Sequence, residues 1–100
     1  TSSQRSAQLP DIPTLAEVGV PGIEGSAWIG FVAPAGLDAD VQKKLSDALI
    51  AAVKDPEVAS RLQGQFMDPV GSTPAEFAAY MDEELGRWQP LIKSLNIQVQ

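Results

Sequence analysis

Residues 24–34 read EGSAWIGFVAP, and this stretch decides the fold that the sequence predicts. Residues 27–33 are apolar throughout, apart from Gly30. A strand with one solvated face alternates apolar and polar residues, whereas a strand covered on both faces need not. Gly25 precedes the apolar run and Pro34 follows it. Both residue types are common where a secondary-structure element begins or ends. The sequence therefore predicts a buried β-strand near 27–33 that carries the chain from a loop-rich part into a helical part.

Four helices are predicted on either side of this strand. Thr14 and Glu17 match a capping box for a short helix over 14–19. Apolar residues at helical spacing predict a helix over 38–54. An aspartate or threonine cap followed by proline predicts two more helices, over 56–64 and 74–95. Short strands are expected near 66–70 and 97–99, so the fold class expected is α/β.

Composition excludes several classes of function. The chain has 100 residues and a net charge of −6, with seven scattered Lys and Arg, so no basic surface for nucleic acid is expected. The absence of His and Cys argues against thiolate metal sites and Ser-His-Asp catalysis. No metal, cofactor or catalytic group is therefore predicted. The abrupt start TSSQRSAQ favours a piece of a longer protein.

Few residues carry candidate chemistry. Three adjacent acidic residues, 82–84, point about 100° apart on a helix, so a solvated face is expected there rather than an acid–base pair. Glycines 19, 22 and 25 lack the Lys-Ser/Thr of a phosphate loop, and turns explain them. Trp28 fits either a core or the wall of a ligand cleft. Ser26 beside it either binds a ligand or satisfies local backbone.

The order of motifs along the chain resembles one protein family. The motifs are LPDIPTxxExG, SAWIGxxAPAG, DPEV, GSTPxEF and RWxPxIK, which begin at residues 9, 26, 55, 71 and 87. This series resembles the C-terminal third of the solute-binding proteins of tripartite tricarboxylate transporters, the Bug or TctC family. The family pattern often has Thr-Pro after Pro-Ala-Gly, whereas Leu37 and Asp38 stand here.

The resemblance implies a two-lobed periplasmic-binding-protein fold. Residues 1–26 would belong to a remnant of the second lobe and its hinge approach, and residues 27–100 to the C-terminal part of the first lobe. The receptor would capture a small carboxylate between the lobes and deliver it to the membrane subunits of the transporter. Ser26, Ala27 and Trp28 would then contact the ligand, and Gly25 and Gly30 would act as hinges.

Two further expectations complete the sequence analysis. The isolated chain should form a dimer or a domain-swapped assembly, because a strand apolar on both faces has unpaired edges. A free-standing acidic interaction module with no small-molecule ligand is the alternative function. Exposure of 27–33 to water is expected to overturn the receptor interpretation.

Overall fold

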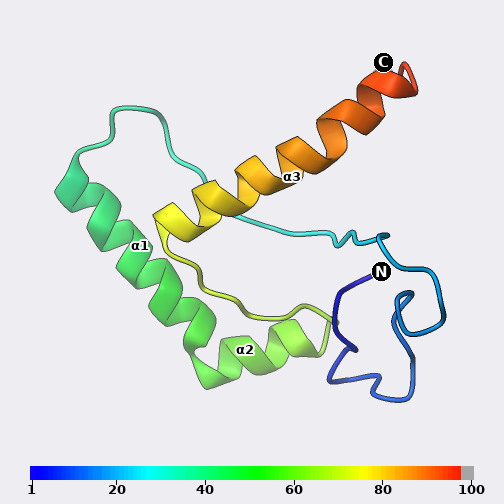
Figure 1. Ribbon diagram of the computed structural model, residues 1–100. Helices are drawn as coiled ribbons and strands as arrows, with labels where there is room; N and C mark the ends of the chain where they lie inside the picture. Colours follow the sequence, from blue (N-terminus) through cyan, green and yellow to red (C-terminus); the bar gives the residue numbers. More distant parts are fainter. Residues whose placement is uncertain (98–100) are drawn as a thin grey trace.

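The chain folds into three helices joined by long irregular segments (Figure 1). A computed structural model describes residues 1–97. The helices are α1 (Ala39–Lys54), α2 (Pro56–Gln63) and α3 (Pro74–Ser94). Residues 1–38 form turns and irregular backbone that lead past α3 to the start of α1. No strand occurs within residues 1–97.

Side-chain caps explain why the helices begin where the sequence predicts. The Asp38 carboxylate accepts hydrogen bonds from the amides of Asp40 and Val41, at 2.9 and 3.3 Å. Asp55 caps α2 in the same way, with Pro56 at the first helical position. These side chains satisfy amide donors that have no partner within the helix. The predictions for the helices over 38–54, 56–64 and 74–95 are confirmed to within one residue at each end.

The start of α3 carries a complete capping box. The Thr73 hydroxyl accepts from the Glu76 amide at 3.3 Å, and the Glu76 carboxylate accepts from the Thr73 amide at 2.8 Å. These bonds lower the pKa of Glu76, chiefly through the Thr73 amide. The segment before this box returns along α1, since Gly71 faces Lys54, Val53 and Ile50. Gly71, three residues before α3, therefore lies against the last turn of α1.

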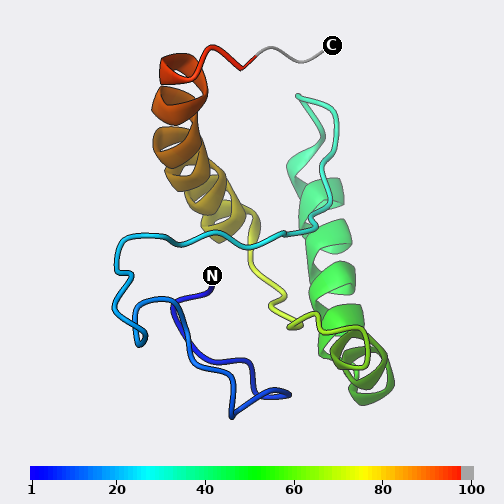
Figure 2. The same ribbon diagram turned by 90° about the vertical axis from the view of Figure 1, so that its right-hand side faces the viewer.

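The predicted α/β class is wrong for the part of the chain that the structure describes. The segment 27–33 runs as an irregular, drawn-out trace and forms no strand (Figure 2). Ile29, Phe31 and Val32 are 80%, 71% and 81% exposed. A strand exists only when a neighbouring chain accepts and donates its backbone hydrogen bonds, and no other backbone group among residues 1–97 bonds to 26–35. The segment is apolar, as the sequence indicates, but its backbone has no pairing partner within residues 1–97.

The two short strands and the first helix also differ from prediction. Residues 66–70 form no strand. The expected strand over 97–99 lies outside the described residues except for Ile97, which is not in a strand. Residues 15–19 form turns where a helix over 14–19 is predicted. The last of these turns ends at Gly19, whose φ is +88°. A helix this short cannot offset the cost of nucleation.

The chain has no closed hydrophobic core. No apolar residue among 1–97 is fully buried. The radius of gyration is 16.7 Å, whereas a compact domain of this length has about 13 Å. Only α1 and α2 form a substantial helix–helix contact among the described residues, and α3 stands apart from both (Figure 2). Contacts of α3 with the irregular N-terminal half consequently hold the chain together.

One ion pair organises the N-terminal loops. Arg5 Nε donates to both carboxylate oxygens of Glu17, at 3.0 and 2.9 Å. Glu17 also accepts from the amide of Thr14 at 2.8 Å, which completes the capping box predicted at this position. Thr14 is only 7% exposed. The Arg5 guanidinium, followed by the Thr14 amide, lowers the pKa of Glu17 to about 2.

This pair should make the N-terminal loops sensitive to acid. A lowered pKa stabilises the folded form above the ordinary carboxyl pKa, so this contribution should fade as the pH falls from about 4.5 towards about 2. In an NMR carboxyl titration, Arg5→Gln should raise the pKa of Glu17. Arg61→Gln, which breaks the exposed Arg61–Glu57 pair elsewhere, should leave it unchanged. An unaltered Glu17 titration in Arg5→Gln would show that the pair does not form.

Candidate functional site

Residues 25–33, called the crossing segment below, cross α3 and contact it through aromatic side chains. The Trp28 ring meets Phe77 edge-on, with ring centroids 5.4 Å apart and planes at 78°. It meets Tyr80 in the same way, at 5.8 Å and 85°. Edge-to-face pairs at these distances are favourable because the positive ring edge faces the negative π-face. Trp28 is thus attached to α3 while 45% of it remains exposed.

Two glycines let the crossing segment approach α3 closely. A Cβ added at Gly30 would lie 2.8 and 2.9 Å from the ring carbons Cε1 and Cε2 of Phe77, and closer still to Cζ. A Cβ added at Gly25 would lie 3.2 Å from Cζ2 of Trp88. A side chain at Gly30 would therefore overlap Phe77, whereas one at Gly25 would crowd Trp88 slightly.

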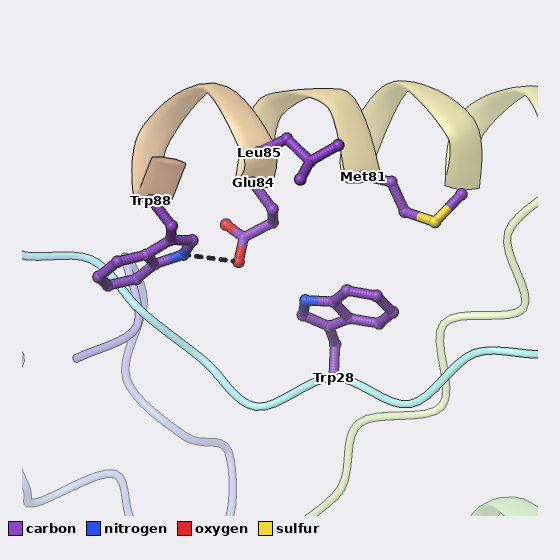
Figure 3. Close-up of a pocket in the computed structure, with 5 residues that line it drawn as sticks. All are labelled: Trp28, Met81, Glu84, Leu85 and Trp88. Carbon is purple, nitrogen blue, oxygen red and sulfur yellow. Dashed lines mark hydrogen bonds between the residues drawn. The ribbon is translucent and has the colours of Figure 1, made fainter. Parts of the chain in front are cut away.

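A hollow of about 310 Å³ opens between the crossing segment and α3 (Figure 3). Trp28 rises into it from the segment, and α3 supplies the remaining walls. Its lining residues are Trp28, Met81, Glu84, Leu85 and Trp88. The walls are apolar apart from the Glu84 carboxylate.

Glu84 is the one buried acidic side chain among residues 1–97, at 9% exposure. The indole Nε1–H of Trp88 donates to one of its oxygens at 3.0 Å (Figure 3). Arg87 Nη1 donates to the other at 3.1 Å. Because a buried charge is costly unless it is paired, these two donors make the position tolerable. Glu84 thereby holds the Trp88 ring over the crossing segment.

The prediction of a solvated acidic face is therefore correct for two residues and wrong for the third. Asp82 and Glu83 are exposed, whereas Glu84 is buried. The sequence contained a signal for this difference: Arg87 and Trp88 follow Glu84 at i+3 and i+4, the spacings at which helical side chains meet. Trp88 lines the apolar hollow and also donates a hydrogen bond to Glu84.

A second hollow, of about 260 Å³, is lined partly by the same segment and by other residues of α3. It is more polar, and its walls come from the N-terminus, the crossing segment and α3: Thr1, Ser2, Ser3, Glu24, Gly25, Ser26, Tyr80, Glu83 and Arg87. The Gly25 amide donates to the Thr1 carbonyl at 3.1 Å, which closes one edge.

The three predicted ligand contacts thus separate in the structure. Ser26 lines the polar hollow, Trp28 lines the apolar hollow, and Ala27 lines neither. Their role in ligand binding stays a prediction, as does the hinge role of Gly25 and Gly30. Residues 1–97 contain no group of three or more acidic side chains placed to hold a metal ion. None of the three helices has a run both long and apolar enough to cross a membrane.

The hydrogen bonds of Glu84 lead to a test by mutation. Glu84→Ala should destabilise the protein by about 0.5–1.5 kcal/mol, because the partly buried indole N–H of Trp88 loses its acceptor. Glu84→Gln should cost less, since its amide oxygen still accepts from Trp88. The measurement is thermal unfolding of the full-length protein that carries this chain, with Glu83→Ala as an exposed control. Equal losses in Glu84→Ala and Glu83→Ala would contradict a structural role for the bond.

Comparison with known proteins identifies the family. The family model described as tripartite tricarboxylate transporter family receptor matches residues 1–97. No solved structure matches. The UPF0065 protein in the tcbD-tcbE intergenic region of Pseudomonas sp. strain P51 is 37% identical over 93 residues, which cover 92% of this chain and 28% of that protein.

Two further relatives show the same coverage. Protein BugT of Bordetella pertussis is 30% identical over 92 residues, which cover 92% of this chain and 28% of BugT. A UPF0065 protein from the TAR-I ttuE-ttuC' intergenic region of Agrobacterium vitis is 37% identical over 95 residues, again 28% of its length. The chain thus spans little more than a quarter of these three relatives. The match over nearly its entire length nevertheless shows that it belongs to the tripartite tricarboxylate transporter receptor family.

Proposed function

We propose that this chain is part of a periplasmic solute-binding receptor that delivers its ligand to a tripartite tricarboxylate transporter. The single observation that carries the proposal is the family match over residues 1–97. The similarity to BugT over 92% of the chain supports the same conclusion. The ligand we propose is a small carboxylate, captured between two lobes.

The exposed apolar residues of 27–33 fit a role inside such a receptor. In the proposed arrangement, residues 1–26 contribute to the second lobe and residues 27–100 to the first. The remaining parts of both lobes would cover Ile29, Phe31 and Val32 and pair with the backbone of the crossing segment. That burial would remove three large apolar side chains from water, each worth about 1.5–3 kcal/mol when fully buried.

A receptor of this kind needs no catalytic group. An anionic ligand between two lobes is held by backbone amides, helix N-termini and bridging water. In the proposed site the Ser26 hydroxyl supplies a hydrogen bond, the Ala27 backbone lies beside it, and Trp28 forms an apolar wall. The lobes would close by rotation in the segments that cross between them.

An acidic interaction module without a ligand is the second candidate. The exposed apolar side chains of the crossing segment favour it, since such patches mark sites of protein contact. It gives no reason for the match to a receptor family. The two candidates differ in whether a small molecule stabilises the protein.

Ligand binding is tested by thermal unfolding of the full-length protein that carries this chain. One class among mono-, di- and tricarboxylates and acidic amino acids should raise the unfolding midpoint. A ligand at 100 times its Kd should add about 2.7 kcal/mol of stability. In Trp88→Phe, the same ligand should change the fluorescence of Trp28. Stabilisation without any fluorescence change would remove Trp28 from the site, and no stabilisation by any compound would favour the interaction module.

The isolated 100-residue chain should associate with itself, as a dimer or a domain-swapped assembly. Its crossing segment exposes apolar side chains and unpaired backbone, both of which promote contact with a second copy. Light scattering should give twice the monomer mass. Val32→Lys should restore the monomer, whereas Val70→Lys, a change at another exposed valine, should not. A monomeric unmodified chain would refute this expectation.

A further inference from the structure

The two glycines of the crossing segment each lie beneath an aromatic ring of α3. Gly30 lies under Phe77, and Gly25 lies under Trp88. The order of the contacts is reversed along the two elements, because the earlier glycine meets the later ring. Neither glycine has a positive φ, so their backbone conformation is open to other residues. What these positions require is space.

The spacing of the two contacts matches along both elements. Phe77 and Trp88 are eleven residues apart, which is about 16.5 Å along a helix and close to three full turns. Gly25 and Gly30 are five residues apart, which is also about 16.5 Å in an extended chain. Both rings therefore project from one face of α3 at the separation of the two glycines. A displacement of one residue in either element would break one of the contacts.

The same register places Trp28. It lies two residues from Gly30, about 6.6 Å along the segment, which corresponds to about four residues of helix beyond Phe77. That position is the level of Met81, with which Trp28 lines the apolar hollow. Glu84 contributes by holding the Trp88 ring in place through the bond to its indole N–H.

We infer that Gly25 and Gly30 are positioning residues that register the crossing segment on α3, and that this segment and α3 move as one unit. The inference rests on the proposed function for its meaning in ligand capture, and it replaces the hinge role predicted for these glycines. Bending would then occur at the flanking glycines, Gly22 and Gly36, so that residues 23–26 would move with the first lobe and not with the second, to which the proposed arrangement assigns them. Each has a φ of +81°, and neither has an atom within 4 Å of the place where a Cβ would lie.

Two pairs of substitutions in the full-length protein test the register. Gly30→Ala should lower the unfolding midpoint by several degrees, because its Cβ overlaps the Phe77 ring. In a Phe77→Ala background, the same change should cost nothing. Gly25→Ala should have a smaller effect, and Trp88→Phe should remove it, since the crowded atoms Cζ2 and Cη2 are absent from phenylalanine. The second pair keeps the test decisive if Phe77→Ala does not fold.

A hinge role predicts different results. At a hinge, Gly30→Ala would reduce the ligand-induced rise in the unfolding midpoint, and Phe77→Ala would not restore it. Under our inference, that rise persists in the double variant and is reduced in Gly22→Ala or Gly36→Ala. Gly86→Ala serves as the control, since nothing lies within 4 Å of its added Cβ. Equal costs of Gly30→Ala with and without Phe77 would overturn the inference.

These measurements separate the inference from the proposed function. If no carboxylate stabilises the unmodified protein, the proposed function fails. The coupling between Gly30 and Phe77 in ligand-free unfolding would still decide whether the register exists. If ligand binds but the coupling is absent, the register fails and the receptor function stands.

Discussion

The structure depends on the contact between an extended backbone segment and the aromatic face of α3. α3 makes no substantial contact with α1 or α2. The packing of the irregular residues 1–38 on α3 therefore joins these parts of the chain. The rings of Phe77 and Tyr80 hold Trp28 edge-on, and the glycines on either side allow backbone and helix to meet. Every residue that lines the apolar hollow belongs to one of these two elements. The position of the candidate site follows from that single contact.

The helices could be predicted from sequence because their signals are local. Asp38, Asp55 and Thr73 each supply the acceptor that a helix start needs within three residues of the cap. The strands could not be predicted reliably, since pairing depends on a partner that no local pattern contains. The prediction of a short N-terminal helix is wrong for another reason. Thr14 and Glu17 form the predicted capping bonds, but Gly19 ends the segment before a helix is established.

The candidate site was predicted only in part. Trp28 was singled out as the residue that is either core or cleft wall, and it lines the apolar hollow. Glu84 was assigned to a solvated face because three consecutive helical residues point about 100° apart and no partner was evident. Arg87 and Trp88, one turn later on α3, are such partners, since each donates a hydrogen bond to one of its oxygens. The residues at i+3 and i+4 therefore decide which of the three carboxylates is removed from water.

Burial of 27–33 was expected as a condition for the receptor interpretation, whereas Ile29, Phe31 and Val32 are exposed. The family match over residues 1–97 stands independently of this burial. The chain covers 28% of BugT, so 72% of that relative lies outside the matched part, and the pairing partners proposed for the segment would belong there. The condition was therefore wrong, and the exposed face of the segment is compatible with a receptor.

The most direct measurement of the central contact is an NMR experiment on the full-length protein that carries this chain. With Gly30 directly under the Phe77 ring, its Hα protons should show nuclear Overhauser effects to the ring protons of Phe77. The π-system should also shift these Hα resonances upfield from their usual position. Both effects should vanish in Phe77→Leu. Gly30 protons at ordinary chemical shifts, with no Overhauser effect to Phe77, would contradict the account that the crossing segment is registered on α3.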